Sequence, residues 1–201
     1  MKHIIKPALS LFLITTVCVV LLDFVYSKTQ GPIESQREKT RQATMKEILK
    51  DADEFTEVDS VVLTGNMKSV YNGRRNGNSI GYIVELGPQG YSGEIRMMVG
   101  ISSNNNKIAG MRVLRQTETP GLGTLAVKEN FYKKYDGKEL EHLSVVRMSP
   151  SENEIEAITS ATITTVAITN AVNEAVRWYL KHVTVDATIE DTDADSGASL
   201  K

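Results

Sequence analysis

The 201-residue sequence has one cysteine, three histidines and few aromatic residues, and its charge is nearly balanced. Cys18 alone cannot form an intramolecular disulfide or a thiolate metal site. His3, His142 and His182 are too far apart in sequence to suggest a shared helical metal face, so we expect ordinary surface or core side chains. A formal charge of -2, with 23 basic residues spread along the chain, gives no electrostatic basis for nucleic-acid binding.

Charge is almost missing from residues 7–26, where Asp23 is the only charged side chain. About 20 helical residues span the roughly 30 Å hydrocarbon core of a bilayer. We therefore interpret residues 1–28 as a transmembrane anchor in the lipid bilayer. A cleaved signal peptide is the alternative, because lysines precede the apolar run and residues 25–27 resemble a cleavage site. The run exceeds the usual signal core of about 7 to 15 residues, which favours a retained anchor.

The orientation of this anchor does not follow from charge, because basic residues lie on both sides of it. A very short N-terminal flank before a signal-like segment usually means that the larger C-terminal part is translocated. We therefore expect a single-pass protein of the cell membrane whose main domain lies on the extracytoplasmic side.

The remaining sequence predicts an α+β fold, in which an antiparallel sheet carries flanking helices. Residues 29–55 are rich in charged residues and glutamine and predict a helical, membrane-proximal linker. Four β-rich runs separated by Gly, Pro and Asn turn signals predict antiparallel hairpins; they are residues 61–63, 80–86, 95–101 and 108–114. Residues 104–106, three asparagines, are the clearest turn.

Two helices and a further strand complete the predicted domain of residues 56–183. Residues 124–135 predict a short amphipathic helix, and residues 143–148 are expected to return to the sheet. A last helix over residues 163–182 is predicted to bury one face through Val172, Val176, Tyr179 and Val183. Residues 184–201 are acidic and poor in large apolar residues, so we predict a disordered tail.

One candidate functional segment is the loop Glu118-Thr119-Pro120-Gly121-Leu122-Gly123, between a predicted strand and a predicted helix. Pro120 fixes one φ angle, while Gly121 and Gly123 permit positive φ and close backbone approach. The loop could therefore lie against a flat ligand with its amides exposed. A simple connecting turn is the alternative.

The second candidate segment is Thr159-Ser160-Ala161-Thr162-Ile163-Thr164-Thr165, where the last helix begins. Hydroxyl groups cap helix starts, but a cap needs only one or two of these five. A helix N-terminus also presents free N–H groups and partial positive charge to a phosphate. A threonine hydroxyl held there could receive a phosphoester, and the small neighbours Ser160 and Ala161 would let a bulky group reach it.

The order of these elements resembles the covalent-FMN domain of RnfG, the G subunit of the Rnf complex. Its relative, the C subunit of the sodium-pumping NADH:quinone oxidoreductase, has a similar layout. The resemblance rests on the anchor, a Gly-Tyr-x-Gly-x-Ile element at 90–95, the loop 118–123 and an acidic-x-x-Ser/Thr-Gly-Ala-Thr-x-Ser/Thr pattern at 156–164. Glu156 stands where the pattern usually has Asp, and Ser160 where it usually has Gly. Serine fits there only if the backbone avoids a conformation that needs glycine.

The resemblance implies that FMN is attached covalently through its phosphate to Thr162 by a flavin transferase. It further implies that Glu156 helps to position this acceptor. Residues of the 118–123 loop would shape the ring pocket, namely Glu118, Thr119, Gly121, Leu122 and Gly123. The other cofactor-binding residues that it implies are Tyr91, Thr159, Ser160, Ala161, Ile163 and Thr164.

The function implied by the resemblance is electron transfer within a membrane complex, together with the other Rnf subunits. This complex passes electrons from reduced ferredoxin to NAD and moves sodium ions or protons outward, and we expect no catalysis by this chain alone. The corresponding C subunit of the quinone reductase is the alternative within the family. An anchored extracytoplasmic scaffold without flavin is the alternative from another class. A hydrolase using Ser160 is disfavoured because no Gly-x-Ser-x-Gly turn surrounds it.

Overall fold

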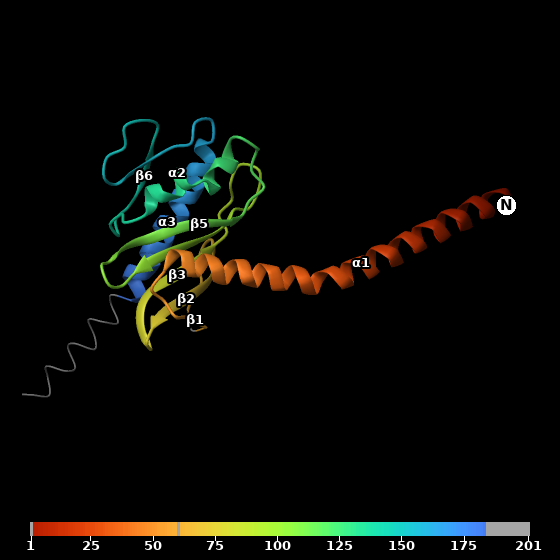
Figure 1. Cartoon of the computed structure of the whole chain (residues 1–201). Helices are drawn as coiled ribbons and strands as arrows, with labels where there is room; N and C mark the ends of the chain where they lie inside the picture. Colours follow the sequence, from red (N-terminus) through yellow and green to blue (C-terminus); the bar gives the residue numbers. More distant parts are fainter. Residues whose placement is uncertain (1, 60, 184–201) are drawn as a thin grey trace, which may run out of the picture. The chain divides into compact units, whose positions relative to one another are not determined.

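The computed structural model describes residues 2–59 and 61–183 (Figure 1). The acidic tail predicted to be disordered, residues 184–201, lies outside these residues. The chain divides into two units, which meet between Gln42 and Ala43. The second unit holds the sheet and all the remaining helices.

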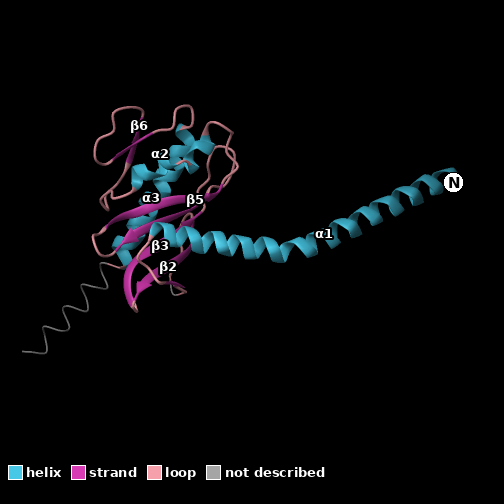
Figure 2. Cartoon of the chain, viewed as in Figure 1, coloured by secondary structure: helices cyan, strands magenta, loops and turns pink. Residues whose placement is uncertain are grey.

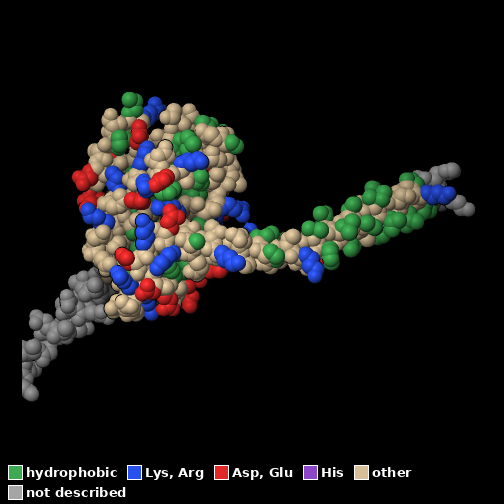
Figure 3. All heavy atoms as spheres, viewed as in Figure 1, with side chains coloured by type: hydrophobic (Ala, Val, Ile, Leu, Met, Phe, Trp, Pro, Cys, Tyr) green, Lys and Arg blue, Asp and Glu red, His purple; other side chains and the backbone are tan. Residues whose placement is uncertain are grey.

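The first long element is α1 (Lys2–Ile48), a helix that contains Pro7 and Pro32. The apolar side chains of its N-terminal half are exposed along the helix, and Figure 3 shows many green side chains along this part of the chain. The hydroxyl groups of Thr15 and Thr16 donate to the carbonyl oxygen of Phe12, so the helix itself satisfies them. The helix is long and apolar enough to cross a membrane.

The helix continues into the predicted linker of residues 29–55 but ends at Ile48, before the end of that linker, and Glu54 and Phe55 belong to a strand instead. The ammonium group of Lys46, in the last turn, donates a hydrogen bond to the carbonyl oxygen of Ala52 beyond the helix end. A cation at this position also interacts favourably with the helix dipole. The helix ends at Ile48, and the first strand begins six residues later at Glu54.

Five antiparallel strands in sequential order form the sheet of the second unit (Figure 2). They are β1 (Glu54–Glu57), β2 (Met67–Arg75), β3 (Asn78–Leu86), β4 (Arg96–Ser102) and β5 (Lys107–Arg115). The last three confirm the predicted runs. The predicted run at 61–63 is not a strand, whereas β1 and β2 were not predicted. Asn106, with φ of 51°, confirms the asparagine turn between β4 and β5.

A glycine inside β2 hides this strand from a prediction by local pattern. Asn-Gly is a typical turn signal, but Asn72 and Gly73 both pair with β1 and β3 inside the sheet. Packing favours glycine at residue 73, because a Cβ there would lie 2.9 Å from Cδ1 of Leu49 and the Leu49 side chain would have to shift. The true hairpin turn is Asn76-Gly77, where both φ angles are positive.

The segment after β5 differs from the predicted single amphipathic helix. Three short helical turns replace it: η1 (Gly123–Val127), α2 (Glu129–Tyr132) and η2 (Lys133–Tyr135). Lys128 is extended, with φ of -82° and ψ of 146°, and separates η1 from α2. The buried residues Ala126, Phe131 and Tyr135 are five and four residues apart, and the short turns bring all three to the core.

Residues 143–148 do not return to the main sheet, which corrects the prediction. Instead, β6 (Ser144–Val146) pairs in parallel with β7 (Glu154–Glu156) in a separate two-stranded sheet. Asn173 supports this segment, because its side-chain amide exchanges hydrogen bonds with both backbone groups of Leu143. The main sheet therefore ends at β5 in the strand order.

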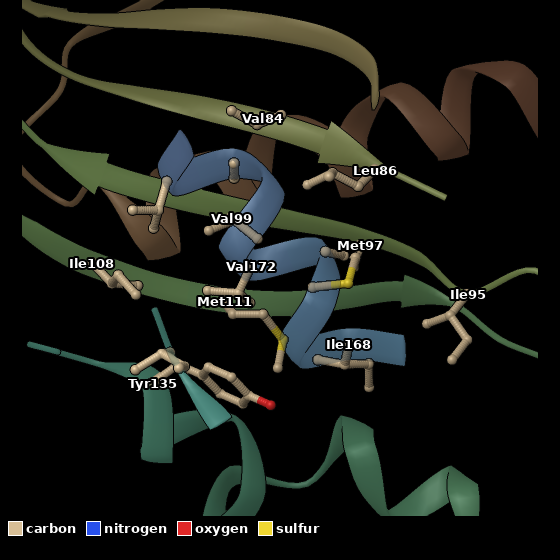
Figure 4. Packing of buried hydrophobic residues seen from close by; sticks show 14 of the residues in the cluster. Val84, Leu86, Ile95, Met97, Val99, Ile108, Met111, Tyr135, Ile168 and Val172 are labelled. Carbon is tan, nitrogen blue, oxygen red and sulfur yellow. The ribbon is translucent and has the colours of Figure 1, made fainter. Parts of the chain in front are cut away.

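Both faces of the sheet are covered by helix. On one face lies α3 (Thr162–His182), whose residues Ile168 and Val172 pack beside Met97, Val99 and Met111 of the sheet (Figure 4). Val172, Val176 and Tyr179 are buried and Val183 is partly buried, which confirms the predicted helix face.

The end of α1 packs on the other face, where Met45, Ile48 and Leu49 form a second buried cluster. Two glycines in the middle of the sheet allow this close contact. A Cβ on Gly100 would lie 2.2 Å from Cγ2 of Ile48, and one on Gly81 would lie within 3.3 Å of both Leu49 methyl carbons.

Candidate functional site

A pocket of about 470 Å³ lies between the loop that follows β5 and the start of α3. This volume falls within the range of about 300 to 1,000 Å³ that is usual for ligand sites. Ten residues predicted from the sequence line it: Tyr91, Glu118, Thr119, Leu122, Gly123, Ser160, Ala161, Thr162, Ile163 and Thr164. The fold therefore brings together three segments that are separate in sequence.

The loop 118–123 forms one wall as a tight turn. The Leu122 amide donates to the carbonyl oxygen of Thr119 at 3.1 Å, and the Gly121 amide donates to the Thr124 hydroxyl at 2.9 Å. Gly121 has φ of 77°, which favours glycine, but it does not line the pocket. These two amides are used within the turn, so the expectation that the loop would expose its amides is wrong for them.

Glu118 is the buried acidic group of the pocket, with 5% of its surface exposed. One carboxylate oxygen accepts a hydrogen bond from the Ser92 amide at 2.9 Å. The other accepts a hydrogen bond from the Thr164 hydroxyl at 2.5 Å. The carboxylate thus connects the loop after β3 to the first turn of α3.

The start of α3 forms the opposite wall. Ala161 occupies the cap position before the helix. Its side chain makes no hydrogen bond to the amides of the first turn. The first amides of α3 are therefore without a side-chain cap, as an anion site requires. Thr165 has a different role: its hydroxyl accepts from the Ile158 amide and donates to the Ala161 carbonyl oxygen.

The two threonines of the Thr-x-Thr pattern have different environments. Thr164 is 1% exposed and its hydroxyl is committed to Glu118. Thr162 is exposed and lines the pocket. Ile163, between them, exposes 58% of its surface. Of these two hydroxyls, only that of Thr162 is open to a ligand in the pocket.

Ser160 has φ of 62°, in the left-handed region that favours glycine. Serine was expected to fit here only if the backbone avoided such a conformation, and it does not. Glycine, which the family pattern usually has at residue 160, would therefore suit this backbone conformation better than serine does.

Three predicted residues do not line the pocket: Gly121, Thr159 and Glu156. Glu156 lies in β7 and forms an ion pair with Lys134, at 3.1 Å. Ser92, whose amide bonds to Glu118, was not predicted from the sequence. The Gly-Tyr-x-Gly element could have pointed to Ser92, because Ser92 is the variable residue of that element.

Two family descriptions match the chain: the RnfG N-terminal region over residues 1–48 and the FMN-binding domain over residues 90–177. The G subunit of the Na⁺-translocating ferredoxin:NAD⁺ oxidoreductase complex of Acetobacterium woodii is 34% identical over 193 residues, covering 89% of this chain and 92% of that protein. The chain belongs to the RnfG family. The resemblance stated from the sequence is thus confirmed.

A second relative agrees with this assignment, and a solved structure shares the fold. The G subunit of the ion-translocating oxidoreductase complex of Methanosarcina acetivorans is 31% identical over 181 residues, which cover 88% of this chain and 95% of that protein. The crystal structure of the C subunit of the Na⁺-translocating NADH-quinone reductase from Parabacteroides distasonis has the same fold, with a TM-score of 0.51 and 22% identity over 65% of this chain and 77% of that one. All ten pocket residues lie within the FMN-binding domain match.

Proposed function

We propose that this RnfG family member carries FMN on Thr162 and relays electrons within a membrane complex that couples ferredoxin and NAD chemistry to ion translocation. The observation that supports the proposal best is the exposed Thr162 side chain at the uncapped start of α3, inside the pocket of an FMN-binding domain. A relative of this chain, from Acetobacterium woodii, is named as part of such a complex.

The pocket residues suit the two ends of FMN. The uncapped amides of α3 provide hydrogen-bond donors and partial positive charge for the phosphate. Three large, partly exposed side chains provide apolar surface for a flat ring; they are Tyr91, Leu122 and Ile163. Bound FMN supplies the redox chemistry, and the protein contributes its placement and surroundings.

Covalent attachment would place the phosphoester on Oγ1 of Thr162. The Thr162 oxygen would form the new P–O bond and lose its proton, while the bond from the same phosphorus to the leaving group of an activated flavin nucleotide breaks. Relative to the unmodified chain, the product gains the mass of one FMN less one water. A flavin transferase would carry out this step. Thr162 then serves as an attachment point and has no acid–base role in electron transfer.

The anchor and the family indicate where this chemistry takes place. The apolar part of α1 would cross the membrane and tether the flavin domain beside the other Rnf subunits. We infer that the domain lies on the extracytoplasmic side, because a signal-like apolar segment usually translocates the domain that follows it.

Thr162→Ala tests the attachment site in full-length protein from a host that contains a flavin transferase. We expect wild-type protein to fluoresce in a denaturing gel and to show the mass of one added FMN less water. Thr162→Ala should lose both signals and still accumulate, because the Thr162 side chain is exposed and the cap residue of α3 is Ala161. Thr56→Ala, a change of an exposed threonine in β1 outside the pocket, is the matched control and should keep the flavin.

A fluorescent Thr162→Ala band would move the attachment to another exposed hydroxyl, with Ser160 the neighbour in the pocket. An unmodified wild-type mass from the same host would instead favour the anchored scaffold without flavin.

A further inference from the structure

The carboxylate of Glu118 is the common contact of all three pocket segments. It accepts hydrogen bonds from the Ser92 amide and from the Thr164 hydroxyl, which lie 26 and 46 residues from it in sequence. Glu118 itself opens the 118–123 loop. One side chain therefore holds the loop after β3, the loop after β5 and the first turn of α3 at fixed separations.

Two glycines leave the space that this carboxylate occupies. A Cβ on Gly90 would lie 2.5 Å from Oε1 of Glu118, and a Cβ on Gly123 would lie 2.6 Å from Oε2. Real Cβ atoms do not approach oxygen so closely, so any larger residue would displace the carboxylate. The glycines of two separate motifs thus serve the same buried group.

The carboxylate has no cationic partner in the part of the chain that the structure describes. Glu85 offers a comparison, since it is buried to a similar extent, with 8% exposed, but forms an ion pair with Arg96 at 3.6 Å. A buried acidic group held only by hydrogen bonds is costly unless those bonds are well made. Because Glu118 also lines the pocket, its carboxylate can act on the geometry of the site as well as on the stability of the fold.

We propose that Glu118 is a positioning residue for flavin attachment. Its bond to Thr164 fixes the first turn of α3, so that the Thr162 hydroxyl, two residues earlier on that turn, stays directed at the pocket. Its bond to Ser92 keeps the Tyr91 loop against the same space. This inference rests on the proposed function, because it concerns the rate at which Thr162 accepts the flavin.

Four variants of the full-length protein test this role. Glu118→Gln removes one acceptor oxygen, and Thr164→Val removes the hydroxyl while keeping the side-chain shape. Thr164→Ser restores the hydroxyl, and Glu85→Gln is the matched change of a buried carboxylate outside the pocket. The flavin-loaded fraction is measured by intact mass at early times after induction of a flavin transferase.

We expect loading to slow about tenfold in Glu118→Gln and Thr164→Val, the factor that corresponds to one charge-assisted hydrogen bond of about 1.4 kcal/mol. Thr164→Ser and Glu85→Gln should load at close to the wild-type rate. If loading depended only on overall stability, Glu85→Gln would slow it as well, whereas a positioning role leaves that control unaffected.

A second measurement does not depend on flavin. In the Thr162→Ala background, peptide-level hydrogen exchange should become faster at residues 90–93 and 161–165 in Glu118→Gln and Thr164→Val, but not in Thr164→Ser. If Glu118→Gln does not accumulate, the two Thr164 variants decide the question. Wild-type loading in Thr164→Val, or no rescue by Thr164→Ser, would overturn the positioning role. A wild-type protein without flavin would instead overturn the proposed function.

Discussion

Replacing Ser160 by glycine is expected to stabilise the folded domain. The left-handed conformation at φ of 62° costs a residue with a Cβ about 1 to 2 kcal/mol. Glycine avoids this cost but loses about 0.5 to 1 kcal/mol through its greater freedom in the unfolded chain. The serine side chain is exposed, so little contact is lost. The net gain in the free energy of unfolding should be about 0.5 to 1 kcal/mol.

Thermal unfolding of the full-length protein in detergent, followed by far-ultraviolet circular dichroism, measures this gain. For a domain of this size we expect Tm to rise by about 1 to 4 °C. Ser160→Ala keeps the Cβ and removes the hydroxyl, so its Tm should stay near that of the wild type. Gly137→Ala introduces a Cβ at φ of 76° with open space around it, and its Tm should fall.

Comparing Ser160→Gly with Gly137→Ala tests whether the left-handed backbone conformation lowers the stability at residue 160. A lower Tm for Ser160→Gly, together with the expected fall for Gly137→Ala, would show that backbone strain at Ser160 does not dominate. The serine side chain would then contribute a stabilising contact.

Three further predictions concern the anchor and the fold. A retained anchor keeps the protein in the pellet after alkaline carbonate washing and leaves its N-terminus at Met1 or Lys2, whereas a mature start near Lys28 would indicate a cleaved signal peptide. Asn105→Cys places a thiol in an exposed turn, and Cys18→Ser removes the native one. This double variant should react with a membrane-impermeant maleimide in intact cells without an outer barrier. Labelling only after lysis would place the domain in the cytoplasm. Gly100→Ala should destabilise the domain by about 1 to 3 kcal/mol, because the new Cβ would collide with Cγ2 of Ile48. Ile48→Ala in the same chain should recover part of this loss. An unchanged Tm for Gly100→Ala would contradict the packing argument.

The sequence by itself was sufficient for features that depend on local chemistry. The apolar run predicts a helix that is long and apolar enough to cross a bilayer, and the N-terminal part of α1 is such a helix. The β-rich runs predict β3, β4 and β5 because side-chain preference and turn residues act over a few positions. The order of the motifs was sufficient for the family, and it selected ten residues that share one pocket.

Local patterns failed where distant packing determines the local structure. Gly73 resembles a turn residue but pairs with both β1 and β3 inside the sheet, and the Leu49 side chain lies where its Cβ would be. Residues 61–63 resemble a strand but have no strand partner within the described residues, since β1 occupies the edge of the sheet beside β2. Neither outcome can be read from the neighbouring residues alone.

The tertiary structure alone decided the roles within the site. It distinguishes the exposed Thr162 from the buried Thr164, although both stand in the same Thr-x-Thr pattern. It places Ser160 in a left-handed conformation. It also brings Glu118 to hydrogen-bond partners 26 and 46 residues away, and such distant contacts leave no periodic pattern in the sequence, because they depend on how the completed sheet and α3 pack together.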